Sequence, residues 1–270
     1  MNRFLTEYYN SYSKYLFTKD NRNTCDYREV IKYIPDFLIT FIKSSPLCVD
    51  NYLFLFIDNQ TVTYTYDKQN MKFKCSPIKS AIIFIPIVIS FPHSTIKHGN
   101  SIIIDTRRKE IEHFEPHGSS AVWWPSINRF LYDLFSNLYP NYNYISTNDF
   151  CPIGPQLISQ DAYCAAWNVL YMKTRIDYPL INRNHIISYL TSLSKENLNH
   201  LISAFICFLH FYGLKTHLLP ALDFYYQLLN QYGDKIYDDE FILNLLLLAE
   251  QFRQTNKYHA LLSLKFKFEI

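Results

Sequence analysis

The spacing of apolar residues changes near Pro125, and this change constrains the fold more than any other feature of the sequence. Before Pro125, short runs of aromatic and β-branched residues end at polar breaks, which is the pattern of strands. After it, apolar residues recur three and four positions apart, which is the pattern of amphipathic helices. The sequence therefore predicts an α+β fold. The predicted strands are residues 51–58, 61–66, 71–75, 81–90, 101–105 and 110–114.

Two of these segments carry further detail. Residues 81–90 are continuously apolar but contain Pro86, which predicts a buried strand with a bulge, or two short strands. Residues 101–105 and 110–114 are joined by a charged segment, which predicts a β-hairpin with a solvated turn.

The helical pattern begins where Ile127, Leu131 and Phe135 fall on one face, and a second helix is predicted to begin near Cys164. Further helices are predicted at residues 27–42, 184–193, 195–212, 221–231 and 239–253. The expected organisation is a mostly helical N-terminal extension over residues 1–45, a core over 46–176, and a helical C-terminal region over 177–270 packed on that core.

Composition and charge exclude several classes of protein. The chain has 270 residues, of which 49% are hydrophobic and 19% charged, so it can bury a full core and is not disordered. Its net charge of +2 is too small for a protein that coats nucleic acid. The apolar run that starts at Leu201 stops at Leu209, short of the ~20 residues of a membrane span, so a buried helix is predicted. Neither nucleic acid nor a membrane is expected as a partner, and no cofactor is expected.

The cysteines point to a compartment. They show no pairing rhythm and no CxxC motif, which predicts reduced thiols in a cytoplasmic protein. Residues 1–17 have no small-residue cleavage site, so no secretory signal is expected. The six cysteines are Cys25, Cys48, Cys75, Cys151, Cys164 and Cys207.

The predicted hairpin brings a histidine close to a carboxylate. If Asp105 pairs with Glu110, His98 lies opposite His117, and Glu115 is two positions away. A register shifted by one pair would place His98 directly opposite Glu115. In either register the two side chains lie within about 5–8 Å. A carboxylate beside a histidine fixes its tautomer and stabilises the imidazolium.

A second segment supplies a candidate nucleophile. A loop with Pro152 and Gly154 leads to the helix that is predicted to begin at Cys164. A helix N-terminus stabilises a thiolate, and a nearby histidine completes the arrangement of a nucleophilic cysteine. The side-chain amide of Gln156 and the backbone N–H of Cys164 are the predicted donors to a developing oxyanion.

The order His98, Glu115, Gln156, Cys164 resembles that of the ubiquitin-like-protein-specific proteases and the adenovirus endopeptidase (adenain). The phrase IEHFEPHG, followed by GPQ and YCAAW, also resembles cysteine-peptidase-like proteins of large cytoplasmic DNA viruses. The resemblance covers roughly residues 82–173. An aromatic residue usually follows the histidine in those proteases and a glycine follows the cysteine, whereas this chain has Gly99 and Ala165.

The resemblance implies a papain-like core, in which a small mixed sheet packs on a central helix headed by the nucleophile. It implies hydrolysis of a peptide or isopeptide bond in a ubiquitin-like protein or viral precursor, in the host cytoplasm or a virion. The implied catalytic residues are Cys164 as nucleophile, His98 as base, Glu115 as its orienting carboxylate and Gln156 as oxyanion donor.

Alternatives exist for each of these roles. His117 or His93 could be the base, and Gln160 could be the amide donor. Glu115 could instead pair with Arg107 or Arg108. Four aromatic residues are open to more than one reading: Trp123 and Trp124 could line a peptide groove or fill the core, and Tyr163 and Trp167 are expected to pack.

Two other functions also fit the residues. A catalytically inactive relative could serve as a binding or virion-assembly protein. A metal-dependent hydrolase would need a zinc site, although no HExxH motif is present. The candidate zinc ligands are His93, His98, His113, His117 and Glu115.

Overall fold

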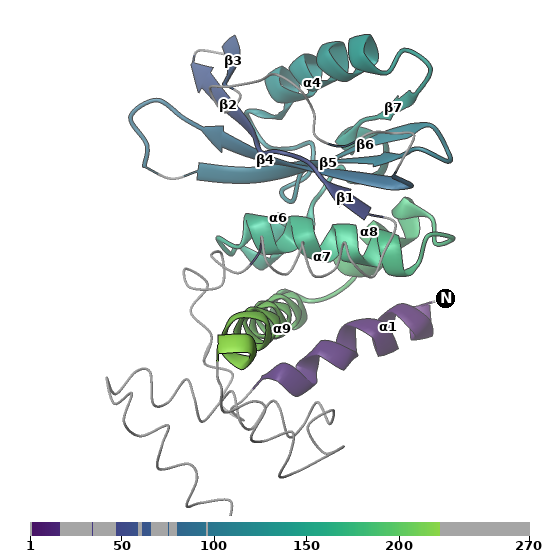
Figure 1. Cartoon of the computed structure of the whole chain (residues 1–270), viewed down its shortest axis with the longest axis vertical. Helices are drawn as coiled ribbons and strands as arrows, with labels where there is room; N and C mark the ends of the chain where they lie inside the picture. Colours follow the sequence, from purple (N-terminus) through teal and green to yellow (C-terminus); the bar gives the residue numbers. More distant parts are fainter. Residues whose placement is uncertain are drawn as a thin grey trace, which may run out of the picture.

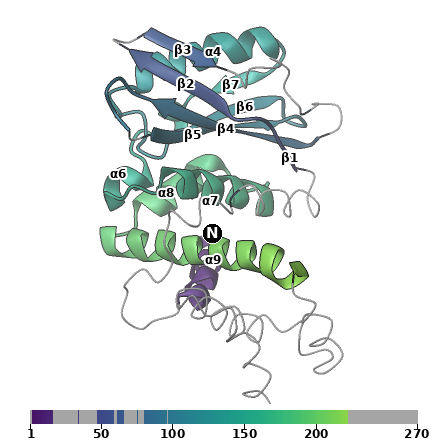
Figure 2. The same cartoon turned by 60° about the vertical axis from the view of Figure 1, so that its left-hand side comes forward.

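The computed structural model describes residues 2–16, 34, 47–58, 61–65, 75, 80–95 and 97–221. Within these residues the chain forms one mixed sheet with helices on both faces, which confirms the predicted α+β class (Figure 1). Helix α4 covers one face, and α6, α7 and α8 lie on the other. Helix α9 packs beyond α7, with α1 and η1 against it, as a second view also shows (Figure 2).

The sheet has seven strands in the order β3-β2-β4-β5-β6-β7, and β1 pairs with β4 beside β2. Three pairs are parallel (β1 with β4, β2 with β4, β6 with β7) and the others are antiparallel. The strands are β1 Leu47–Val49, β2 Leu53–Asp58, β3 Thr61–Thr65, β4 Ile82–Ser90, β5 Lys97–Asp105, β6 Glu110–Phe114 and β7 Asn143–Ile145.

Strand β4 is a single strand without the expected break. Its register with β5 runs unbroken from Ile82 opposite Asp105 to Ser90 opposite Lys97, so the predicted bulge is wrong. On the other side of β4, its pairing with β1 ends at Phe84 and its pairing with β2 starts at Ile87. Pro86 lies in the gap between these partners, where a missing N–H interrupts neither ladder.

Strand β4 is continuously apolar because both of its faces are buried. Ile83, Ile85 and the next alternate residues pack under α4, whereas Ile82 and Phe84 face the α7 side. Two cores therefore lie on opposite faces of the sheet. The α7 core is built around Trp167 and continues into α8, α9 and α1.

Most predicted elements are present with shifted ends. The β5–β6 hairpin has the predicted register, with Asp105 opposite Glu110. The predicted helices near residues 125, 164, 184–193 and 195–212 are confirmed. The helices are α1 Asn2–Asn10, η1 Ser11–Tyr15, α4 Trp124–Leu138, α5 Thr147–Phe150, α6 Pro155–Ser159, α7 Cys164–Asp177, α8 Arg183–Thr191 and α9 Lys195–Ala221.

Some elements differ from the sequence-based expectation. Strands β1 and β7 were not predicted, and α6 occupies a segment expected to be a loop. Helix α1 was not predicted individually, but it lies in the N-terminal extension that was expected to be mostly helical. Except for single residues, the predicted strand at 71–75 and the predicted helices at 27–42, 221–231 and 239–253 lie outside the described residues.

The cysteines correct the expectation of reduced thiols. Cys48 and Cys75 form a disulfide with a Cα–Cα distance of 5.9 Å, and Cys207 is also disulfide-bonded. Among the described cysteines, Cys151 and Cys164 are free. The disulfide was not predictable from spacing, because a bridge depends on tertiary distance and not on sequence separation.

Helix α9 contains the most apolar stretch of the chain. Residues from Leu201 to Leu209 are largely buried in the α7 core, as the sequence predicts. Within the described part of the chain, no helix combines the length and apolarity that a membrane span requires.

Candidate active site

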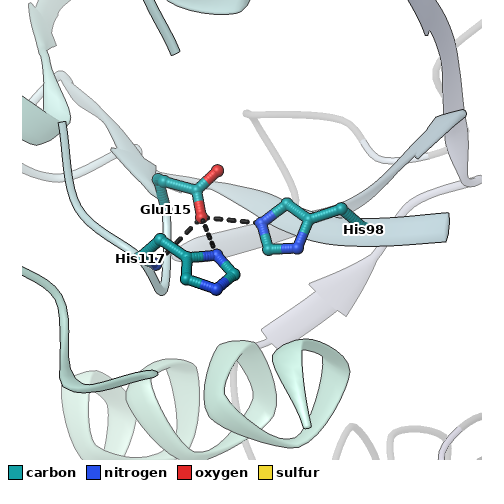
Figure 3. Close-up of side chains that lie close together, drawn as sticks. All are labelled: His98, Glu115 and His117. Atoms are coloured by element: carbon teal, nitrogen blue, oxygen red, sulfur yellow. Dashed lines mark hydrogen bonds and ion pairs between the residues drawn. The ribbon is translucent and has the colours of Figure 1, made fainter. Parts of the chain in front are cut away.

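The open end of the β5–β6 hairpin holds a histidine–carboxylate pair. His98 lies on β5, and Glu115 directly follows β6. The distance from His98 Nε2 to Glu115 Oε1 is 2.7 Å (Figure 3). Both residues are buried, with exposed fractions of 7% and 0%. The predicted proximity of His98 and Glu115 is confirmed.

Glu115 accepts hydrogen bonds at both carboxylate oxygens. The backbone N–H of His117 donates to Oε1 at 2.9 Å, and Trp123 Nε1 donates to Oε2 at 3.2 Å. Burial alone would raise the pKa of Glu115, but the charge of His98 and the donors from His117 and His98 hold this pKa well below its usual range. Glu115 is therefore ionised at neutral pH.

The alternative pairing of Glu115 with arginine is wrong. Arg107 Nε lies 3.4 Å from Asp105 Oδ1, and Arg108 Nε lies 3.9 Å from Asp105 Oδ2. Both arginines of the turn therefore pair with Asp105 at the far end of the hairpin, and Glu115 pairs with His98 instead.

Cys164 is the first residue of α7 and lies against β5. The backbone N–H of Gly99 donates to Cys164 Sγ at 3.2 Å. A Cβ atom added at Gly99 would lie 3.5 Å from this sulfur, so the strand approaches the thiol closely. The predicted start of the helix at Cys164 is confirmed, and the thiol lies beside the residue that follows His98.

The His98 ring interacts with both Glu115 and Cys164. Burial, the largest single influence, lowers the pKa of His98. The negative charge of Glu115 and hydrogen bonds with Cys164 and Glu115 together outweigh burial and raise this pKa to about 10. Because Nε2 faces Glu115, the second ring nitrogen is the one left for the thiol. At neutral pH, His98 is therefore held as an imidazolium between a carboxylate and a sulfur.

Asn168 fastens α7 to β5 and was not singled out by sequence analysis. Its Nδ2 donates at 2.8 Å to the carbonyl oxygens of both Gly99 and Cys164. Its Oδ1 accepts from Ser101 Oγ at 2.7 Å, and Asn168 itself is only 3% exposed. Asn168 thereby fixes the N-terminus of α7 against the strand that carries His98. Its position one helical turn after Cys164 is the signal that could have identified it.

Gln156 lies in α6, on the segment before Cys164. It is 2% exposed, and its Nε2 donates to the backbone carbonyl of Asp161 at 3.0 Å. Its Oε1 is buried without a hydrogen-bond partner. The other predicted donor, Gln160, is directed toward α9, where its Oε1 accepts from Lys195 Nζ at 2.5 Å.

Two glycines let the segment with Gln156 pass the Glu115 turn. An added Cβ at Gly154 would lie 2.0 Å from the carbonyl oxygen of Pro116, and Gly118 has a φ of 85°. Backbone N–H groups of Gly154 and Gln156 donate to this turn at 3.0 Å. Only glycine permits this approach.

Of the other histidines, His117 lies beside His98, whereas His113 and His93 lie apart from it. The ring of His117 lies 4.8 Å from that of His98, and its Nδ1 is 3.5 Å from Glu115 Oε1. In Figure 3 the carboxylate of Glu115 lies between the two rings. His113 is buried elsewhere, 3.2 Å from Asn100, and burial lowers its pKa to about 4. His93 is exposed in the loop before β5.

The same cluster contains side chains that can bind a metal ion. Among the described residues, single ligand atoms of His98, Glu115 and His117 lie within 4.8 Å of one another, whereas His93 and His113 are not part of this group. Two imidazoles and one carboxylate are ligands that zinc accepts. These side chains are therefore of the types that bind zinc, but His98 Nε2 and Glu115 Oε1 already form a hydrogen bond with each other.

Four aromatic residues near the site were considered from the sequence, namely Trp123, Trp124, Tyr163 and Trp167. Of these, Trp123 belongs to the site. Its ring lies 5.1 Å from the His98 ring, and its N–H contacts Glu115. Trp167 is buried in the α7 core, and Tyr163 packs against that core. Trp124 begins α4.

A cavity of about 290 Å³ opens beside the thiol, between the sheet and α7. Its wall is largely apolar. The lining residues are Ile34, Tyr52, Phe84, Pro86, Ile87, Val88, Lys97, His98, Gly99, Asn100, Ala162, Cys164, Ala165, Asn168 and Val169.

Comparison of the chain with protein-family models, with curated proteins and with solved structures gave no match.

Proposed function

We propose that this protein is a cysteine protease, a thiol hydrolase that cleaves peptide or isopeptide bonds. The observation that carries the proposal is the buried chain of interactions from Glu115 through His98 to Cys164. A buried imidazolium between a carboxylate and a thiol at a helix N-terminus is the arrangement that activates cysteine as a nucleophile. The order of these residues, and their resemblance to the ubiquitin-like-protein-specific proteases and adenain, support a papain-like reading of the α+β fold.

In the proposed reaction, the Cys164 thiolate attacks the scissile carbonyl carbon. The carbon–nitrogen bond then breaks, and His98 gives its proton to the leaving amine. A water molecule next attacks the thioester while His98 accepts its proton. The carbon–sulfur bond breaks, which releases the carboxylic acid and restores the cysteine. Glu115 keeps its negative charge and orients His98 throughout.

The oxyanion requires donors near the N-terminus of α7. The backbone N–H of Cys164 is the first proposed donor. Gln156 is the second, because a side-chain amide carries two protons and only one is given to Asp161. Gln156 acts as an oxyanion donor when bound substrate turns this second N–H toward the oxyanion that forms beside the thiol.

The proposed substrate is a protein or peptide, of the ubiquitin-like or viral precursor type. Of the two compartments expected from the sequence, a virion suits the Cys48–Cys75 disulfide better than the host cytoplasm. Disulfides are rare in the reducing cytosol and persist in oxidising surroundings.

The direct test is covalent labelling of Cys164. An electrophilic ubiquitin-like or peptide probe should label the wild-type chain, and Cys164→Ala should abolish labelling and turnover. Cys151→Ala is the matched control, because it removes the other free cysteine of the described chain, which is fully buried. Labelling that persists in Cys164→Ala would remove Cys164 from the mechanism. A Cys164 that alkylates no faster than a free thiol would favour the inactive binding or virion-assembly protein.

One observation favours a second candidate, a metal-dependent hydrolase. His98, Glu115 and His117 together offer two imidazoles and a carboxylate. The two candidates separate cleanly. Iodoacetamide should inactivate a thiol hydrolase and leave a metal-dependent enzyme active, whereas a chelator should do the reverse. Metal analysis of the purified chain gives an independent readout.

A further inference from the structure

The segment between α6 and α7 is held by the side chain of one acidic residue, Asp161. Its Oδ1 accepts from the backbone N–H of Tyr163 at 2.8 Å. Its Oδ2 accepts from Trp167 Nε1 at 2.9 Å and from the hydroxyl of Ser159. Trp167 and Ser159 are each 1% exposed, so these two donors are themselves fixed by burial. The carboxylate therefore joins the end of α6 to the first turns of α7.

Asp161 anchors the start of α7 without acting as its N-cap. A typical N-cap side chain accepts the N–H of the second or third helical residue. In α7 the N-cap residue is Tyr163, which makes no side-chain cap bond to the helix. Asp161 instead holds the N–H of Tyr163 itself, one residue before the helix begins at Cys164. The helix start is thus anchored without a cap that competes for its first N–H groups, among which is the Cys164 N–H.

The backbone carbonyl of Asp161 holds the other proposed oxyanion donor. It accepts the side-chain amide of Gln156 at 3.0 Å. Ser159 adds to this connection, because its hydroxyl contacts Asp161 and also lies 3.2 Å from the carbonyl oxygen of Gln156. The Cys164 N–H and the Gln156 amide are therefore both held through Asp161, the first by its side chain and the second by its backbone.

We propose that Asp161 is a positioning residue of the oxyanion site, which holds the Cys164 N–H and the Gln156 amide within reach of the same oxyanion. The inference rests on the proposed function and adds a residue to it. Two donors stabilise one oxyanion together only when both are directed at it, and less reorganisation is needed when they are held in place beforehand. Asp161 acts through these donors and not on the reacting atoms.

This role predicts that two reactions of the same thiol respond differently. In acylation by p-nitrophenyl acetate, the Cys164 thiolate attacks the ester carbonyl carbon and an oxyanion forms. The carbon–oxygen bond then breaks, which releases p-nitrophenolate and leaves an acetyl thioester. Alkylation by iodoacetamide forms a carbon–sulfur bond with loss of iodide, and no oxyanion develops. A residue that acts on the oxyanion site should affect acylation and spare alkylation.

The test measures both rate constants in the full chain. Release of p-nitrophenolate reports acylation, intact mass reports alkylation, and Cys164→Ala gives the background to subtract. In Asp161→Asn one of the two acceptor oxygens becomes an NH2 group, so at least one of the three donors loses its partner. Acylation should fall by at least about tenfold, and alkylation should keep the wild-type rate.

The matched control is Asp149→Asn. Asp149 accepts the backbone N–H of Ser146 in the capping box of α5, so this variant makes the same chemical change away from the thiol. Both rates should stay at the wild-type values.

A double variant tests whether Asp161 acts through Gln156. If it does, Asp161→Asn combined with Gln156→Ala should lower acylation by less than the product of the two single losses. Losses that multiply would show that the two residues act independently, which would overturn the connection through Gln156.

The remaining outcomes separate this proposal from the proposed function. Equal losses of acylation and alkylation in Asp161→Asn, or unchanged acylation, would overturn the positioning role and leave the protease standing. If Asp161→Asn does not fold, Ser159→Ala removes a single donor and should give a smaller loss of acylation alone; unchanged acylation there would also overturn the role. A wild-type Cys164 that reacts with neither probe faster than an ordinary free cysteine would instead refute the proposed function.

Discussion

At the scale of single residues, the site depends on the hydrogen bonds that the Glu115 carboxylate accepts. Glu115 accepts from the His98 ring, the His117 backbone and the Trp123 indole, so a fully buried charge is compensated at both oxygens. Buried charges are tolerated only with such compensation. The result is an ionised Glu115 beside a protonated His98, and this pair should make both activity and stability depend on Glu115.

Glu115→Gln should lower kcat/KM by about a hundredfold, because the imidazolium loses its orienting charge. It should also change the pH dependence of stability. The pKa of His98 is about 10 in the folded chain and 6.5 as a free group. The contribution of protonated His98 is therefore complete below pH 6.5 and is lost as the pH rises toward 10.

The depressed pKa of Glu115 acts in the opposite direction, since its contribution is present above its ordinary value of 4.5 and is lost at lower pH. Free energies of unfolding by denaturant at pH 6, 8 and 9.5 measure the His98 part. The wild-type chain should lose stability over this range more steeply than Glu115→Gln. Glu7→Gln, at an exposed site, should retain the wild-type slope. Parallel curves for wild type and Glu115→Gln would contradict the assigned pair.

At the scale of elements, the site is the junction of one hairpin and one helix. The β5–β6 ladder runs from Asp105 opposite Glu110 to Ser101 opposite Phe114, and His98 and Glu115 meet just beyond its end. The sequence predicted the proximity of His98 and Glu115 in either of two registers, because pairing is counted outward from the turn. The junction with α7 depends on Asn168, which joins Gly99 and Cys164. Its position one helical turn after Cys164 is visible in the sequence, but its contact with Gly99 spans 69 positions and follows only from the tertiary packing.

Asn168→Ala should lower the rate of Cys164 alkylation and kcat by about tenfold, with little change in KM, because the helix start is no longer fixed to β5. The matched control is Asn182→Ala, which removes the N-cap of α8. The control should lose about 1 kcal/mol of stability and keep the alkylation rate. Equal alkylation rates in wild type and Asn168→Ala, measured with iodoacetamide, would show that Asn168 has only a structural role.

At the scale of the whole molecule, two cores and a disulfide hold the scaffold of the site. The α4 core and the α7 core lie on opposite faces of the sheet, so β4 and β5 are fixed from both sides. The Cys48–Cys75 disulfide ties β1 to a residue 27 positions later. Strand β1 pairs with β4, and β4 pairs with β5, the strand that carries His98.

The double variant Cys48→Ala/Cys75→Ala should therefore be less stable by roughly 3–4 kcal/mol, the value that loop-closure entropy gives for a loop of this length. It should still react at Cys164, because the disulfide does not contact the thiol. Denaturant unfolding and labelling of Cys164 check the two parts separately. Unchanged stability would show that the disulfide does not constrain the unfolded chain, and loss of labelling in a folded variant would show that the site needs β1.

The sequence by itself determined the α+β class, the presence of the β5–β6 hairpin and the start of α7 at Cys164, since each depends on local spacing of apolar and turn residues. The tertiary structure decided which of the two possible registers the hairpin adopts, with Asp105 opposite Glu110. Local spacing also placed Glu115 near His98. The tertiary structure decided which histidine faces Glu115 with its ring at 2.7 Å, that Gln156 contacts Asp161, and that Cys48 bonds to Cys75. It also decided that β5 approaches the thiol at Gly99 and that a cavity opens beside Cys164. These features join segments far apart in the chain, and their distances are set by how the sheet and helices pack, which no local pattern records.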